Sequence, residues 1–400
     1  MTTSNEGKIG INTAVTIGMK SMIGAGIFST TSLLGSKIGP AGILAYLLAF
    51  AAVWFIAQSF ARVAYLYPQE GSFYNYAKQA GGHTLGLMAA GSYLIGLLIA
   101  MGLLTKIAGM YVQAFFPEIS LTTINILTVG LLIALNVFGM KLSSMGIYIL
   151  LSLTMYAITM TSALCLSNFN IANLFPFMPY GFGSVMAGTK VAVFGLFGFE
   201  SIASLFNIMK NPEQNVPKAL RLTILFVGII YFVFIGSILT GIPQEVFLLL
   251  PDITIPQTLM QVFPNHPWII QSIAVSILFA IVGTIHAMLW SSSQFMLSYF
   301  KVLNIASIND YKPTSNTCVI IGGSIILFMC LTLTDIKTFF SLTDTFILFA
   351  FITTIIPLLK LKSEWKSGQN YITLMGLISA LIIFAVAGEA LVKNLITWFH

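Results

Sequence analysis

Apolar stretches of about 20 residues recur along the whole chain, separated by short polar links. A helix needs about 20 apolar residues to cross a bilayer. In lipid the backbone has to satisfy its hydrogen bonds internally, which favours helices as spanning elements. Only 8% of the 400 residues are charged, against about 25% in soluble domains. The sequence therefore predicts an all-α integral membrane protein embedded in a lipid bilayer.

About eleven transmembrane helices are expected by this length criterion. They cover roughly 10–36, 40–66, 84–116, 121–138, 144–166, 186–208, 218–241, 268–299, 317–333, 337–358 and 371–394. Most lysines and arginines fall in links and span ends on the same side as the N-terminus, and the positive-inside rule assigns that side to the cytoplasm. We therefore expect a multi-pass protein of the plasma or inner cell membrane with a cytoplasmic N-terminus.

Four charged residues lie near the opposite ends of spans, namely Lys37, Lys190, Glu389 and Lys393. A long charged side chain near a span end can extend to the membrane interface. These four residues are therefore expected to have structural roles.

Composition argues against several other classes of protein. The net charge of +6 comes from basic residues scattered singly, which do not form a groove for nucleic acid. Cys165, Cys318 and Cys330 lie in or beside apolar segments without pairing or metal-ligand spacing, and are interpreted as core residues. We expect no metal and no cofactor. No Ser/His, paired Asp or metal-ligand pattern suggests an intramembrane enzyme.

The first span contains an irregular segment, Ser21–Phe28, in which Gly24 and Gly26 lie one residue apart. Two glycines weaken a helix. If the helix opens there, the freed N–H and C=O groups are tolerable in the membrane only where they line a cavity. The alternative is a close contact between helices through small residues. The segment alone does not separate these two interpretations.

The sixth span repeats this irregularity, with Gly195 and Gly198 in mid-span and Glu200 directly after them. The first and sixth spans are five apart, so they cross the membrane in opposite directions. Corresponding broken helices in two halves of opposite topology indicate an inverted-repeat transporter. The sixth span therefore favours the helix break over simple packing.

Four segments in this order resemble the amino acid–polyamine–organocation superfamily, the amino acid permeases. They are Ser21–Phe28, Pro68–Tyr74, Phe197–Ser201 and Lys210–Ala219. The Phe-Glu-Ser sequence within the third is most similar to basic amino acid and polyamine exchangers of that superfamily.

The resemblance implies a leucine-transporter-type fold, a 5+5 inverted repeat with broken helices 1 and 6. The first five-helix repeat would cover 1–168, the inverted repeat 169–362, and an appended transmembrane helix 363–400. The substrate, an amino acid or related amine, would lie between the first and sixth helices. The third, eighth and tenth helices would line its pocket.

Backbone groups at the two breaks are suited to bind a zwitterion. The N–H groups of Gly24, Ala25 and Gly26 would begin the outer half-helix, whose positive end favours a carboxylate. Freed carbonyls near Ile23 and around Phe194–Phe197 would accept an ammonium. The expected substrate-binding residues are Ile23, Gly24, Ala25, Gly26, Phe194, Phe197, Gly198 and Glu200. Phe194 is interpreted either as an aromatic lid or as ordinary packing.

The chain departs from the family pattern on the expected cytoplasmic face. Arg62 stands where the family usually has a glutamate, and Asn207 and Ile208 where it has an acidic pair. Phe295 stands where it usually has an arginine. Most members also have twelve spans. These altered residues all lie on the expected cytoplasmic face. The chemistry of the inner gate and the mode of coupling therefore cannot be carried over from the family.

Five ionisable residues fall far from any span end: Lys20, Lys106, Glu200, His286 and Asp344. Burying a charge at mid-span costs about 2.5–3.5 kcal/mol on insertion scales, so each is a candidate for coupling or gating. Glu200 would contact the substrate amine or carry a proton, or else accept from N–H groups freed by the break. Lys106 would pair with a buried carboxylate such as Glu200 or Asp344, in a functional or a structural ion pair. His286 would handle protons or be a satisfied core histidine, and Asp344 could bond locally to its threonine neighbours.

Lys20 leads to the most specific hypothesis. In sodium-coupled relatives of this fold a sodium ion bridges the inner half of the first helix and the eighth helix. Here the ligands of such a sodium ion would be carbonyls near positions 20 and 23, with hydroxyls such as Ser291 or Ser292 opposite. An ammonium at Lys20 would repel sodium and replace it as the cation that holds the helices together. Burial would make Lys20 a candidate proton carrier. The alternative is that Lys20 extends to the cytoplasmic interface and only packs there.

The predicted function is a secondary transporter of amino acids or related amines, monomeric or homodimeric, that alternates access to a mid-membrane site. It would be proton-coupled or an exchanger, and independent of sodium. The main alternative is a substrate sensor built on a transporter scaffold, without net transport. A channel is disfavoured because no ring of polar residues is visible.

Overall fold

The computed structural model describes residues 8–67, 73–139, 144–249, 254–303, 313–333, 335–360 and 370–399. Within these ranges the regular elements are helices. In addition, one isolated parallel β-bridge pairs Ile9 with Met209. Nine helices in the described part are long and apolar enough to cross a membrane, or ten when a bent pair is counted as one span. The expected span at 121–138 is a shorter apolar helix of 17 residues.

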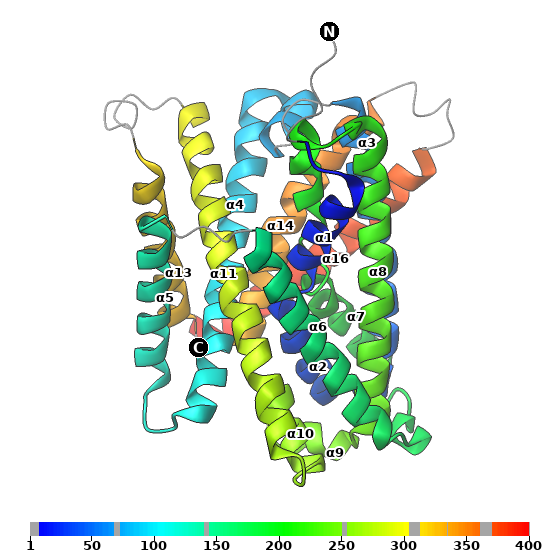
Figure 1. Cartoon of the computed structure of the whole chain (residues 1–400). Helices are drawn as coiled ribbons and strands as arrows, with labels where there is room; N and C mark the ends of the chain where they lie inside the picture. Colours follow the sequence, from blue (N-terminus) through cyan, green and yellow to red (C-terminus); the bar gives the residue numbers. More distant parts are fainter. Residues whose placement is uncertain are drawn as a thin grey trace.

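The elements follow the predicted spans closely (Figure 1). They are α1 (Ile11–Met22), α2 (Ala25–Lys37), η1 (Gly39–Ala41), α3 (Gly42–Leu66), α4 (Phe73–Phe115), α5 (Leu121–Val137), α6 (Ser144–Ser167), η2 (Ile171–Leu174), α7 (Gly181–Phe194), η3 (Phe199–Ile208), α8 (Pro212–Gly241), α9 (Gln244–Leu249), α10 (Ile255–Val262), α11 (Pro267–Leu303), α13 (Ser315–Thr332), α14 (Ile336–Leu359) and α16 (Asn370–Phe399).

The first and sixth predicted spans are each divided into two helices, α1 with α2 and α7 with η3. The first half of each packs against the second half of the other, because α1 contacts η3 and α2 contacts α7. This exchange of partners requires the two broken spans to run antiparallel. In Figure 1 α1 begins toward the upper end of the bundle, and α9 and α10 lie at the lower end.

Continuous helices surround this broken pair. α14 packs against α4 and α16, α11 packs against α4 and α6, and α3 packs against α8. Buried aromatic rings fill the space between α3, α4, η3 and α14, where Phe60, Phe73, Phe199 and Phe351 contact one another. The outward faces of the helices carry exposed apolar side chains such as Leu127 and Phe232. Such a surface is suited to lipid.

Some sequence predictions fall outside the described residues. These are positions 68–72 of the Pro68–Tyr74 segment, the expected boundary at 362–363, and the side chains of Ala25 and Asn207.

Candidate functional site

The first span is broken at its glycines, as the sequence predicts. α1 ends at Met22, and the helix axis bends by 43° between Ile11–Met22 and Gly26–Lys37. Gly24 has φ −124° and ψ −143°, far from helical values, and its N–H donates to the carbonyl of Met22 at 3.0 Å. The chain therefore turns at Gly24 and restarts as a helix at Ala25.

The second break uses Gly198 in a conformation that other residues rarely adopt. Its φ is +116°, and a Cβ there would collide with the carbonyl of Ser21 on α1. A Cβ added to Gly26 would lie 2.9 Å from the Cα of Gly195. The backbones of the two breaks are thus in direct contact. Both sequence interpretations hold at once, because the glycines allow the break and also the close approach.

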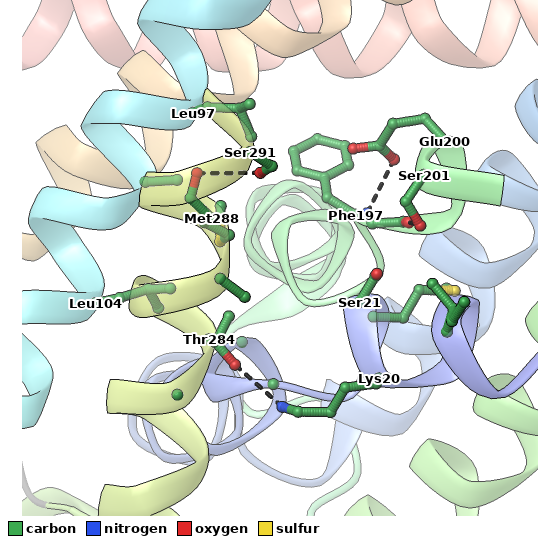
Figure 2. A pocket seen from close by; sticks show the side chains of 18 of the residues that line it. Lys20, Ser21, Leu97, Leu104, Phe197, Glu200, Ser201, Thr284, Met288 and Ser291 are labelled. Atoms are coloured by element: carbon green, nitrogen blue, oxygen red, sulfur yellow. Dashed lines mark hydrogen bonds between the residues drawn. The ribbon is translucent and has the colours of Figure 1, made fainter. Parts of the chain in front are cut away.

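A cavity of about 460 Å³ lies beside these breaks. Eight of the predicted residues line it: Lys20, Gly24, Gly26, Phe194, Phe197, Gly198, Glu200 and His286. The third, eighth and tenth predicted spans contribute as expected, through α4, α11 and α14, and α6 contributes as well. Figure 2 shows Met288 and Ser291 of α11 across the cavity from Phe197 and Glu200. Its wall is mainly apolar, with side chains such as Leu97, Leu104 and Ile347.

Ile23 does not line the cavity in the described structure. Its side chain is fully buried in the core, because the residue closes the last turn of α1, where its N–H donates to Met19 at 2.6 Å. The sequence analysis assigns Ile23 a role through its backbone carbonyl, which belongs to the break, and that role stays a prediction.

Backbone groups at the breaks retain capacity for a ligand. No side chain caps the N-terminus of α2, whose first N–H groups have no acceptor within the helix. The carbonyl of Met22 accepts from both the N–H of Gly24 at 3.0 Å and the hydroxyl of Tyr231 at 2.8 Å, whereas that of Phe194 accepts from the N–H of Phe197 at 3.3 Å. Each carbonyl oxygen has two lone pairs. The region can therefore accept an anion at α2 and a cation at the carbonyl oxygen of Phe194.

Glu200 faces the cavity with both carboxylate oxygens held. Oε1 accepts from the hydroxyl of Tyr93 at 3.0 Å, and Oε2 accepts from the N–H of Gly198 at 2.9 Å. The backbone bond matches the interpretation in which the break itself holds the carboxylate. Because Glu200 also lines the cavity, contact with a substrate amine remains compatible with this geometry.

Lys20 links α1 to α11 across the cavity (Figure 2). Its Nζ donates to Oγ1 of Thr284 at 3.2 Å. Ser291 and Ser292, the hydroxyls expected on the opposite side of a sodium site, bond to carbonyls of their own helix, at Met288 and Leu289. The hydroxyl of α11 that contacts Lys20 belongs to Thr284, about two turns before Ser291. The interpretation that Lys20 extends to the membrane interface is wrong.

The other ionisable candidates have separate environments. Lys106 donates to the carbonyl of Leu333 at 3.2 Å and does not line the cavity. Nδ1 of His286 lies 2.9 Å from Nδ2 of Asn136, as expected of a satisfied core histidine. Asp344 is fully buried, does not line the cavity, and its oxygens have no hydrogen-bond partner among the described residues. The expected local bonds from Asp344 to its threonine neighbours are therefore absent.

Sequence reasoning missed three residues that hold the site together: Tyr93, Tyr231 and Thr284. Tyr93, Leu97 and Leu104 recur at helical spacing on one face of α4, which could have indicated a wall of the cavity. Tyr231 and Thr284 carry no such signal, because hydroxyl-bearing residues are frequent in these spans.

The chain matches a family model described as amino acid permease over residues 13–388. It is 29% identical to an uncharacterized transporter of Mycobacterium tuberculosis, over 56% of this chain and 53% of that protein. It is 26% identical to an aromatic amino acid transport protein of Corynebacterium glutamicum, over 74% of this chain and 68% of that protein. It is 25% identical to an aspartate-proton symporter of Bacillus subtilis, over 58% of this chain and 47% of that protein. The chain thus spans about half the length of the first and last of these relatives.

Proposed function

We propose that this chain, which belongs to the amino acid permease family, is a secondary transporter of amino acids or related amines. The observation that carries the proposal is the direct contact of the two helix breaks at Gly26 and Gly195 beside the cavity. Paired broken helices are how many secondary transporters build a mid-membrane binding site.

A zwitterionic substrate would use the polar groups of both breaks. Its carboxylate would bind at the uncapped N-terminus of α2, where the helix dipole favours an anion. Its ammonium would bind near Glu200 and the carbonyl of Phe194. Its side chain would then face the apolar wall around Met288 and Ile347. This wall favours apolar amino acids over the basic amino acids that the Phe-Glu-Ser resemblance suggests.

The mode of transport is proposed to be alternating access in a 5+5 inverted repeat with a cytoplasmic N-terminus. Antiparallel packing of the two broken spans supports the inverted repeat. The contact of the Lys20 ammonium with Thr284 supports independence from sodium, because a fixed positive charge between α1 and α11 disfavours a cation there. A relative named as an aspartate-proton symporter supports proton coupling.

The first experiment is a thermal-shift screen of the purified protein against all amino acids and common polyamines, since a ligand stabilises the folded state by mass action. The best ligands are then tested for counterflow into proteoliposomes preloaded with the same compound. Protein-free liposomes serve as the control. Accumulation of label by counterflow supports transport, and its absence for every ligand that binds contradicts it.

The second candidate function is a substrate sensor. It is favoured by the altered residues at the expected cytoplasmic face, where Arg62 stacks over the ring of Tyr65 and Phe295 packs against Tyr93. A sensor would show a thermal shift with ligand but no counterflow. The same two measurements therefore separate the two functions.

A further inference from the structure

Two buried ionisable residues, Lys190 and Asp344, lie apart from the cavity. Lys190 on α7 is 7% exposed and Asp344 on α14 is fully buried. Nζ of Lys190 donates to Oγ of Ser341 on α14 at 2.9 Å. The expectation that Lys190 extends to the membrane interface is therefore wrong, because its ammonium is held inside the α7–α14 contact.

Within the part of the chain that the structure describes, the carboxyl group of Asp344 has no hydrogen-bond donor. Both of its oxygens are without a partner, and so is the hydroxyl of the adjacent Thr343. The hydroxyl of Thr345 donates to the carbonyl of Ser341 at 2.7 Å and is not available. An ionised carboxylate buried without donors carries a large desolvation cost, which a neutral carboxylic acid avoids. In this conformation Asp344 is therefore expected to hold a proton.

The same helix contact includes a pair of aromatic rings that bounds the cavity. Phe194 on α7 lines the cavity, and its ring meets that of Phe340 on α14 edge to face, with centroids 4.8 Å apart. Lys190 lies one turn before Phe194, and Asp344 lies one turn after Phe340. Residues four apart share a helix face. The aromatic pair and the two ionisable residues therefore belong to one α7–α14 contact.

Lys190 is the charged group that acts electrostatically on Asp344 within the described structure. Asp335 and Lys337, at the start of α14, act on Lys190. The ionisable groups of the other packed helices have their own contacts. Lys106 on α4 donates to Leu333, Tyr93 on α4 donates to Glu200, Tyr46 on α3 bonds to Thr30, and Glu389 and Lys393 on α16 pair with each other.

We propose that Asp344 is the proton-binding site of the transporter and that Lys190 controls its release; this rests on the proposed function. While α7 packs against α14, Lys190 bonds to Ser341 and the carboxyl of Asp344 keeps its proton. When this contact opens, water reaches Asp344, its O–H bond breaks, and the proton passes to water. Water and the positive charge of the Lys190 ammonium then stabilise the carboxylate. Opening of the cavity past Phe194 is thereby linked to exchange of one proton.

The test uses proteoliposomes containing the full chain, with a ligand identified by the thermal-shift screen. Counterflow is measured without a pH gradient, and uptake and proton entry are measured with one. Asp344→Asn is expected to retain counterflow and to lose both gradient-driven uptake and substrate-dependent proton entry. Lys190→Met removes the charge that stabilises the carboxylate, so it is expected to give the same result. The control is Glu389→Gln, which alters an exposed ion pair on α16 and should leave both activities unchanged.

The outcomes separate the inference from the proposed function. A wild-type protein that binds ligand without counterflow overturns the proposed function. If the wild type shows counterflow but no response to the pH gradient, the assignment of Asp344 as the proton site is refuted and the proposed function stands. Proton entry that survives in Asp344→Asn refutes the same assignment. Infrared difference spectra of purified wild type minus Asp344→Asn provide a readout that does not depend on transport. We expect the carbonyl stretch of one protonated carboxylic acid, and its absence refutes the assignment. If Asp344→Asn does not fold, Lys190→Met carries the transport test.

Discussion

Gly26→Ala tests whether the contact between the two breaks forms the binding site. The added methyl group would lie 2.9 Å from the Cα of Gly195, whereas ordinary contact begins at 3.4 Å. Since the obstacle is backbone, the two half-helices must separate by about 0.5 Å. Overpacking a close contact costs about 1–3 kcal/mol. If the substrate binds while the breaks touch, its Kd should rise about 5- to 150-fold, at tenfold per 1.4 kcal/mol.

The assay is titration calorimetry of the purified protein with the best ligand. Gly195→Ala is the matched control, because a Cβ at that position lies no closer than 3.4 Å to any neighbour, and the residue is already helical. Gly130→Ala on α5, with nothing within 4 Å, controls for a change of helix propensity. We expect weak binding only in Gly26→Ala. Wild-type affinity in that variant, or an equal loss in Gly195→Ala, would refute the steric argument.

Three further predictions concern single contacts. Tyr93→Phe removes a donor to the buried Glu200 carboxylate. The binding free energy of the ligand, measured by calorimetry, should therefore weaken by about 1.5–3 kcal/mol. Unchanged affinity would show that this bond does not position the site. Uptake by the wild type should be equal in sodium and choline buffers. Lys20→Met should abolish uptake, because it removes the cation held at Thr284. Stimulation of wild-type uptake by sodium would contradict the role given to Lys20. Gly198→Ala places a side chain at φ +116°, a backbone strain of about 1–3 kcal/mol. The melting temperature of this variant in detergent should therefore be lower than that of Gly130→Ala. Equal melting temperatures would show that Gly198 is not needed for this backbone conformation.

The spans and both breaks could be predicted from the sequence because their signals are local. Hydrophobic length places a helix in the membrane, and paired glycines show where it is weakest. Gly24 and Gly198 were therefore found without knowledge of their neighbours. The antiparallel relation of the two breaks followed from counting spans.

The partners of the charged residues could not be predicted in this way, because they depend on how distant helices are rotated against each other. Lys20 finds Thr284, 264 positions away in the chain, and Lys190 finds Ser341, 151 positions away. Serines and threonines are frequent in every span, so the sequence offers many equivalent partners. Lys106 shows the same limit, since its depth suggested a carboxylate but its bond goes to a backbone carbonyl.

The two broken spans hold their lysines in a related way. Lys20 and Lys190 each lie about one turn before the first glycine of their break, and each donates to a hydroxyl on a continuous helix. Thr284 and Ser341 also bond to carbonyls of their own helices, at 2.8 and 3.0 Å. When such a contact separates, the hydroxyl is already satisfied and only the ammonium needs a new partner. Separation of a buried ion pair would instead leave two uncompensated charges in the membrane. Lysine–hydroxyl contacts therefore hold the half-helices in place at a lower cost of separation, as the proposed alternating access requires.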